Sequence, residues 1–127
     1  MTGHTMQLGA VRVFVDDVLV ARDFYANRLG LELRVDGPRF GYCVFRSGTV
    51  ELIVEAAGAD APADDRALVG RFTGLSFDVA DIQAEHQRLS GLGVPFGGAP
   101  ELQPWGGCLA TLRDPSGNQL QLTQREG

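Results

Sequence analysis

Side chains that could bind or act on a small molecule recur at every second residue of segments 8–16, 49–55, 72–79 and 118–124. Alternate residues of a β-strand point to opposite faces of its sheet. One face would be apolar, with Val11, Val13, Val15, Val50, Leu52, Val54, Leu75, Phe77, Val79, Leu120 and Leu122. The other would carry Arg12, Phe14, Glu51, Ile53, Glu55, Phe72, Ser76, Asp78, Gln119, Gln121 and Thr123. This mixture is typical of a small-molecule pocket, but it also fits a sheet face that is simply wet.

Glu51 has the clearest chemical potential in the mixed set. Its carboxylate could act as a general base, provided that burial raises its pKa and a substrate proton comes within hydrogen-bond reach. A plain ion pair between Glu51 and Arg12 is an alternative that involves no ligand. Trp105, in segment 103–107, could stack on a ligand at the rim of a pocket or anchor a loop by packing.

The first half of the chain reads as a strand, a helix and three further strands. Asp17 follows strand 8–16 as a helix cap, and Gly30 is suited to end the helix. Apolar residues recur there at three- and four-residue steps, at Val18, Ala21, Phe24, Tyr25 and Leu29. Turn residues then separate predicted strands 31–36, 40–46 and 49–55.

The second half repeats this order. Strand 72–79 is followed by a helix that Asp81 caps and Gly93 ends. The sequence then predicts a short strand 94–97 and strands 107–113 and 118–124, the last two joined by the turn Asp-Pro-Ser-Gly at 114–117.

Matching tetrapeptides support a duplicated unit. Val-Asp-Asp-Val at 15–18 parallels Val-Ala-Asp-Ile at 79–82, and the Leu-Gly and Ser-Gly pairs also recur, at offsets of about 64 to 69 residues. We therefore expect one domain, 7–125, made of module 1 (7–56) and module 2 (70–125). The Ala-, Asp- and Gly-rich segment 57–69 shows no clear period and would be a surface linker.

Composition narrows the function classes. The net charge of −5 and pI near 4.8 disfavour nucleic acid and anionic membranes as partners. The sequence shows neither a secretory leader nor a membrane-spanning run, which favours a cytoplasmic location. Cys43 and Cys108 lie in apolar runs and are expected to be buried thiols, with a disulfide or a catalytic role as the alternative.

Two segments resemble the vicinal oxygen chelate superfamily, which includes glyoxalase I, extradiol dioxygenases and bleomycin resistance proteins. VDDVLVARDFYANRLGLEL is similar to the family's V-x-D-x-x-x-A-x-x-FY-x-x-x-LG, and RDPSGNQLQL to its DP-x-G-N-x-(I or L)-E-(I or L). The resemblance implies an α+β fold in which two βαβββ modules form an open, barrel-like mixed sheet around a cavity, with helices on the outer face. It also implies a homodimer, in which the modules are either paired within one chain or exchanged between chains.

Metal-dependent members of this superfamily hold one divalent ion at four strand positions, which correspond here to Ala10, Glu51, Gly74 and Gln121. Only Glu51 is a good ligand, because alanine and glycine lack donor atoms and a neutral amide binds transition metals poorly. His4 precedes the first strand and His86 falls in the second helix, so neither is expected to compensate. The sequence therefore predicts no metal site and no other cofactor.

The leading hypothesis is a metal-independent protein that sequesters a small organic molecule. Its predicted cavity is lined by Arg12, Phe14, Glu51, Ile53, Phe72, Ser76, Trp105, Gln119 and Gln121. One alternative is a lyase, isomerase or dioxygenase with Glu51 as metal ligand or catalytic base. Another is a non-catalytic interaction domain whose polar face is merely solvated.

Overall fold

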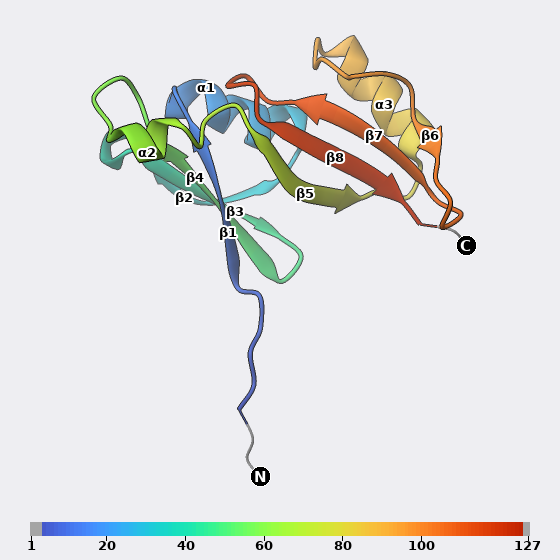
Figure 1. The fold of residues 1–127 in the computed structure, drawn as a ribbon, viewed down its shortest axis with the longest axis horizontal. Helices are drawn as coiled ribbons and strands as arrows, with labels where there is room; N and C mark the ends of the chain where they lie inside the picture. Colours follow the sequence, from blue (N-terminus) through green and yellow to red (C-terminus); the bar gives the residue numbers. More distant parts are fainter. Residues whose placement is uncertain (1–3, 126–127) are drawn as a thin grey trace.

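Each half of the chain forms one four-stranded mixed sheet, as the duplication predicts (Figure 1). The computed structural model describes residues 4–125. Sheet A is formed by β1 (Ala10–Val15), β2 (Glu32–Gly37), β3 (Tyr42–Ser47) and β4 (Val50–Ala56). Its strand order is β1-β4-β3-β2, with β1 parallel to β4 and the other pairs antiparallel. Sheet B repeats it as β5-β8-β7-β6, formed by β5 (Phe72–Asp78), β6 (Glu101–Leu102), β7 (Cys108–Arg113) and β8 (Gln119–Gln124).

The two predicted helices begin and end where their sequences indicate. The Asp17 carboxylate accepts hydrogen bonds from the first turn of α1 (Val18–Asp23), which continues as a π-helical segment, Phe24–Arg28. Asp81 caps α3 (Ile82–Gly91) in the same way, at 3.1 Å from the Ala84 nitrogen. Gly30 and Gly93 follow with φ of +80° and +86°, a conformation that glycine adopts without strain and that ends a helix.

Contrary to the sequence prediction, no strand forms at 94–97. This segment makes an isolated bridge, Phe96 to Leu112, and the edge strand is instead the two-residue β6. Pro95 has no N–H group to donate, so a continuous ladder cannot form along it. The linker 57–69 also contains one short helix, α2 (Ala63–Arg66), which its composition did not reveal.

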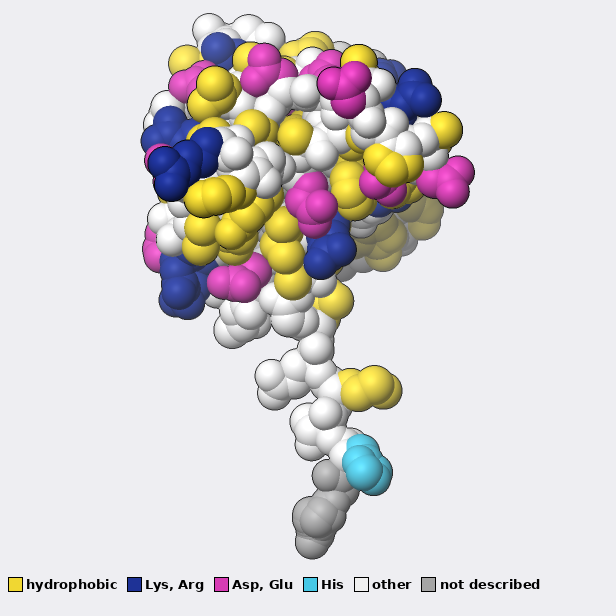
Figure 2. All heavy atoms as spheres, turned by 90° about the vertical axis from the view of Figure 1, so that its left-hand side faces the viewer, with side chains coloured by type: hydrophobic (Ala, Val, Ile, Leu, Met, Phe, Trp, Pro, Cys, Tyr) yellow, Lys and Arg dark blue, Asp and Glu magenta, His cyan; other side chains and the backbone are white. Residues whose placement is uncertain are grey.

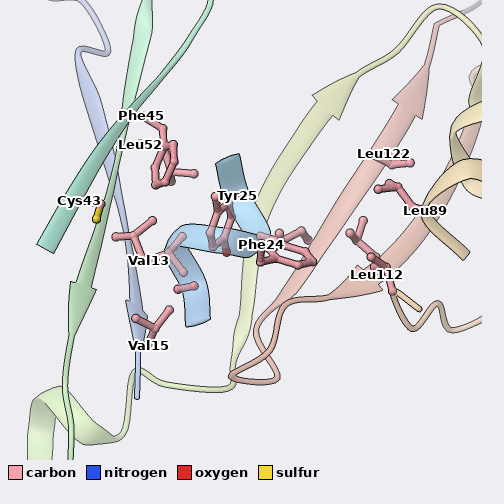
Figure 3. Close-up of a cluster of buried hydrophobic side chains, with 14 of the residues drawn as sticks. Val13, Val15, Phe24, Tyr25, Cys43, Phe45, Leu52, Leu89, Leu112 and Leu122 are labelled. Atoms are coloured by element: carbon pink, nitrogen blue, oxygen red, sulfur yellow. The ribbon is translucent and has the colours of Figure 1, made fainter. Parts of the chain in front are cut away.

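One hydrophobic core joins the two modules. Buried side chains of sheet A, including Val13 and Leu52, belong to the same cluster as Leu112 and Leu122 of sheet B. Phe24 lies between the two sheets in Figure 3, next to Tyr25, with ring centroids 5.0 Å apart in an edge-to-face arrangement. The sheets do not close into a barrel; β1 meets the segment that precedes β5 at the isolated bridge of Phe14 with Val69.

A buried polar cluster adds a second connection between the modules. The Asp114 carboxylate accepts four hydrogen bonds, from the Tyr25 hydroxyl, the Ser116 nitrogen, and the backbone and side-chain nitrogens of Asn118. Burial and the adjacent Asp114 charge raise the pKa of Tyr25, so its hydroxyl stays protonated and donates. The Phe-Tyr and Asp-Pro motifs thus position the modules against each other.

The surface of the described residues is mixed in charge. Acidic and basic side chains are interspersed on the face in Figure 2, and an extended N-terminal segment leads away from the body of the molecule. None of the helices within residues 4–125 is long and apolar enough to cross a membrane.

Candidate functional site

The alternation in the strands places the mixed set of side chains on the side of each sheet that faces away from the core. In sheet A, Val13, Val15 and Val54 are fully buried, whereas Arg12 on β1 is exposed. In sheet B, Leu120 and Leu122 are buried, whereas Ser76 and Phe72 are exposed. We call this side the open face; it carries Arg12, Phe14, Glu51, Ile53 and Glu55 in sheet A, and Phe72, Ser76, Asp78, Gln119, Gln121 and Thr123 in sheet B.

On sheet A, the ion pair of Arg12 with Glu51, which was one of the alternatives, does not form. The Arg12 guanidinium instead lies 3.2 Å from the carboxylate of Glu55. Both acids flank Ile53, which is opposite Arg12, so either could be reached by the long side chain. Glu51 is half-buried, directly opposite Ala10 on one side and Arg46 on the other. It is therefore a carboxylate on the open face that Arg12 does not neutralise.

On sheet B, hydroxyl and amide groups interact across the strands. Ser76 lies opposite Gln121, with 3.5 Å between its hydroxyl and the amide oxygen, and the Gln121 amide nitrogen lies 3.4 Å from the Thr111 hydroxyl. A register shift between Phe72 and Ser76 contains Gly74, whose φ is +75°. The register shift places Ser76 rather than Gly74 opposite Gln121. Counting residues from the motifs could not detect it.

The four positions that correspond to the family's metal ligands do not fit a metal ion. Ala10 lies beside Glu51 and supplies no donor, and the Ser76 hydroxyl beside Gln121 is neutral. Catalytic zinc sites use three protein ligands, drawn from histidine, cysteine and carboxylates. Within residues 4–125, no group of three or more such side chains comes together.

Trp105 lies in the turn between β6 and β7. Its side chain is half-exposed and packs on Gly107, where even a single Cβ would overlap the indole ring. It bounds a hollow of about 440 Å³ together with Ser76, Asp78, Thr123 and Arg125. Both predicted roles of Trp105 are therefore compatible with its position, because one part of the ring packs and the other faces the hollow.

The predicted cavity residues are divided between the two sheets and do not line one enclosed pocket. Ser76 and Trp105 share the hollow on sheet B, whereas Arg12, Phe14, Glu51 and Ile53 lie on sheet A. Arg125 and Gly107 were not predicted as site residues. Alternation within strands could not reveal them, because Arg125 follows β8 and Gly107 has no side chain.

Comparison with known proteins decides the family. Residues 3–122 match the model of the Glyoxalase/Bleomycin resistance protein/Dioxygenase superfamily. The chain belongs to this superfamily. The resemblance drawn from the two sequence motifs, and the α+β fold of paired βαβββ modules that it implied, are confirmed.

Solved structures of this superfamily resemble the chain over almost its whole length. A superfamily member from Sphaerobacter thermophilus is 28% identical, with a TM-score of 0.78, over 95% of this chain and 98% of that one. TnmS3, an antibiotic binding protein from a Streptomyces species, is 26% identical, with a TM-score of 0.78, over 98% of this chain and 100% of that one. Lactoylglutathione lyase from Agrobacterium tumefaciens is 21% identical, with a TM-score of 0.75 and 95% of each chain covered, and shows the shared fold alone. No curated protein matches the sequence.

Proposed function

We propose that this superfamily member sequesters a small organic molecule on its open face and does so without a resident metal ion. The main support for metal independence is the identity of the residues at the four metal positions, where Glu51 alone is a strong ligand. The polar and aromatic groups of the open face are suited to orient an organic molecule. The similarity to TnmS3, an antibiotic binding protein, supports the same class of function.

A second copy of the chain would complete the cavity in this proposal. Phe72 at the start of β5 and Trp105 near its end are each about half exposed in the single chain, at 54% and 50%. Apolar surface of this kind is suited to contact a ligand or another protein. A homodimer, with modules paired within or between chains, would bring two open faces together and enclose the molecule.

Sedimentation velocity is expected to give a dimer at micromolar protein concentration. The reason is the half-exposed aromatic surface at Phe72 and Trp105, which a partner would cover. Phe72→Glu should shift the equilibrium toward monomer, because a charge would be buried at the interface. Phe40→Glu is the matched control, since Phe40 is 68% exposed but lies in the turn before β3. A wild-type protein that sediments as a pure monomer would contradict the shared cavity.

Metal analysis tests the absence of a resident ion. Protein purified without a histidine tag is expected to contain far less than one equivalent of nickel, zinc or iron by mass spectrometry, because the four positions lack donors. Divalent ions should change neither the melting temperature of the wild type nor that of Glu51→Ala. Stoichiometric metal, or stabilisation by one ion that Glu51→Ala abolishes, would instead indicate a metal-dependent lyase, isomerase or dioxygenase.

A further inference from the structure

Two hollows on module 2 share the side chains of Asp78 and Arg125. The first, of about 440 Å³, also includes Trp105 and Thr123. The second, of about 510 Å³, extends past Gly107 to the end of β8. Asp78 therefore borders two spaces that a small molecule could enter.

The Asp78 carboxylate is held by one fixed and one exchangeable partner. The Thr123 hydroxyl donates to one oxygen at 2.6 Å, and Thr123 is buried opposite Asp78 in the sheet. Arg125 contacts the other oxygen at 3.2 Å, through a side chain that is 79% exposed. Hydrogen bonding from Thr123, and more weakly from Arg125, lowers the pKa of Asp78 and keeps it ionised. Exposed ion pairs add little stability, so Arg125 can give way to a competing cation.

Trp105 is fixed beside this carboxylate. Its ring packs on Gly107, and the turn that carries it is closed by hydrogen bonds between Gln103 and Gly107 (2.8 Å) and between Gly106 and Gln103 (2.9 Å). Trp105 is about half exposed and lines the hollow that Asp78 also lines. An aromatic face next to an ionised carboxylate is the combination that attracts organic cations.

We propose that Asp78, Trp105 and Thr123 form a subsite for the cationic group of an organic ligand, such as an amine or amidine, with Arg125 as the counterion that the ligand displaces. The ligand's cation would lie against the indole and donate to the Asp78 oxygen that Arg125 now occupies. The net charge of −5 favours the approach of a cation. This inference rests on the proposed function, because it names the class of molecule that the open face would hold.

Fluorescence titration can test the subsite directly, because Trp105 is the only tryptophan of the chain. The probes are benzamidine, which is cationic, and benzamide, which is similar in shape and neutral. We expect both to change the Trp105 emission, with benzamidine bound about tenfold more tightly. Asp78→Asn should abolish this preference, whereas Arg125→Ala should increase benzamidine affinity by about threefold, because it removes the competing cation.

Asp36→Asn is the matched control. The Asp36 carboxylate also accepts a hydrogen bond from an exposed arginine side chain, that of Arg22, at 2.8 Å, but it lies on module 1. This variant should keep the wild-type preference. Equal affinities for the two probes, a preference that survives Asp78→Asn, or weaker binding by Arg125→Ala would overturn the subsite. A thermal-shift screen of cationic, neutral and anionic aromatic compounds separates the two proposals. Cationic compounds that stabilise the wild type and Asp78→Asn equally would refute the subsite alone, whereas a screen with no binder of any charge would refute the proposed function as well.

Discussion

Asn118→Ala is expected to lower the free energy of unfolding by about 3 kcal/mol, because several buried polar groups lose their partners together. The Asn118 side chain is fully buried. Its amide oxygen accepts from the backbone nitrogens of Gly70 and Arg71, at 2.8 and 3.2 Å. Its amide nitrogen donates to the Phe14 carbonyl at 2.8 Å and to Asp114 at 3.0 Å. One side chain therefore ties β1 and the segment just before β5 to the hairpin turn of module 2.

Urea unfolding followed by circular dichroism measures this loss. Small proteins have m-values of about 1–3 kcal/mol/M in urea, so the midpoint should fall by about 1–3 M. Asn27→Ala is the matched control, because Asn27 makes its hydrogen bond to Asp23 on the surface, at 2.7 Å. It should change stability by less than about 0.5 kcal/mol. Equal midpoints for the two variants would show that the buried network does not hold the modules together.

Local signals in the sequence predicted most of the fold. Asp17 and Asp81 mark helix starts because an aspartate oxygen can accept the free N–H groups of the first turn, which depends on neighbours alone. The strand at 94–97 was predicted wrongly, because Val94 and Phe96 suit a strand while Pro95 cannot donate to a ladder. The role of Asn118 as a link to Gly70 and Phe14 could not be predicted, since those contacts come from distant parts of the chain.

The sequence predicted the face of the sheet on which each site residue lies, but not the residues that it contacts. Alternation showed that Arg12, Glu51 and Glu55 share one side of sheet A, because strand periodicity fixes the side of each residue. It could not select Glu55 as the partner of Arg12, since both acids lie diagonally from it. Gly74 illustrates the same limit: a bulge changes the cross-strand neighbour of Gln121 without changing the motif. Contacts in the site therefore depend on register, which the sequence pattern leaves open.

Phe24→Ala is expected to cost about 3–5 kcal/mol, the usual range for truncating a buried phenylalanine, out of a total of about 5–15 kcal/mol for a domain. Phe24 is 2% exposed and lies between the two sheets in the shared core, against the ring of Tyr25 (Figure 3). Truncation to alanine would leave a cavity between the two sheets. The variant should therefore lose stability in both modules in one cooperative transition.

Leu19→Ala is the control for this prediction, because Leu19 is on the same helix but 63% exposed. Alanine also favours the helix slightly, so the control should unfold within about 0.5 kcal/mol of the wild type. The measurement is urea unfolding monitored both by Trp105 emission, which reports on module 2, and by circular dichroism, which reports on the whole chain. Coincident transitions shifted together by Phe24→Ala would support one core. If the Trp105 transition were unchanged while circular dichroism shifted, the modules would unfold separately, and Phe24 would not join them in one core.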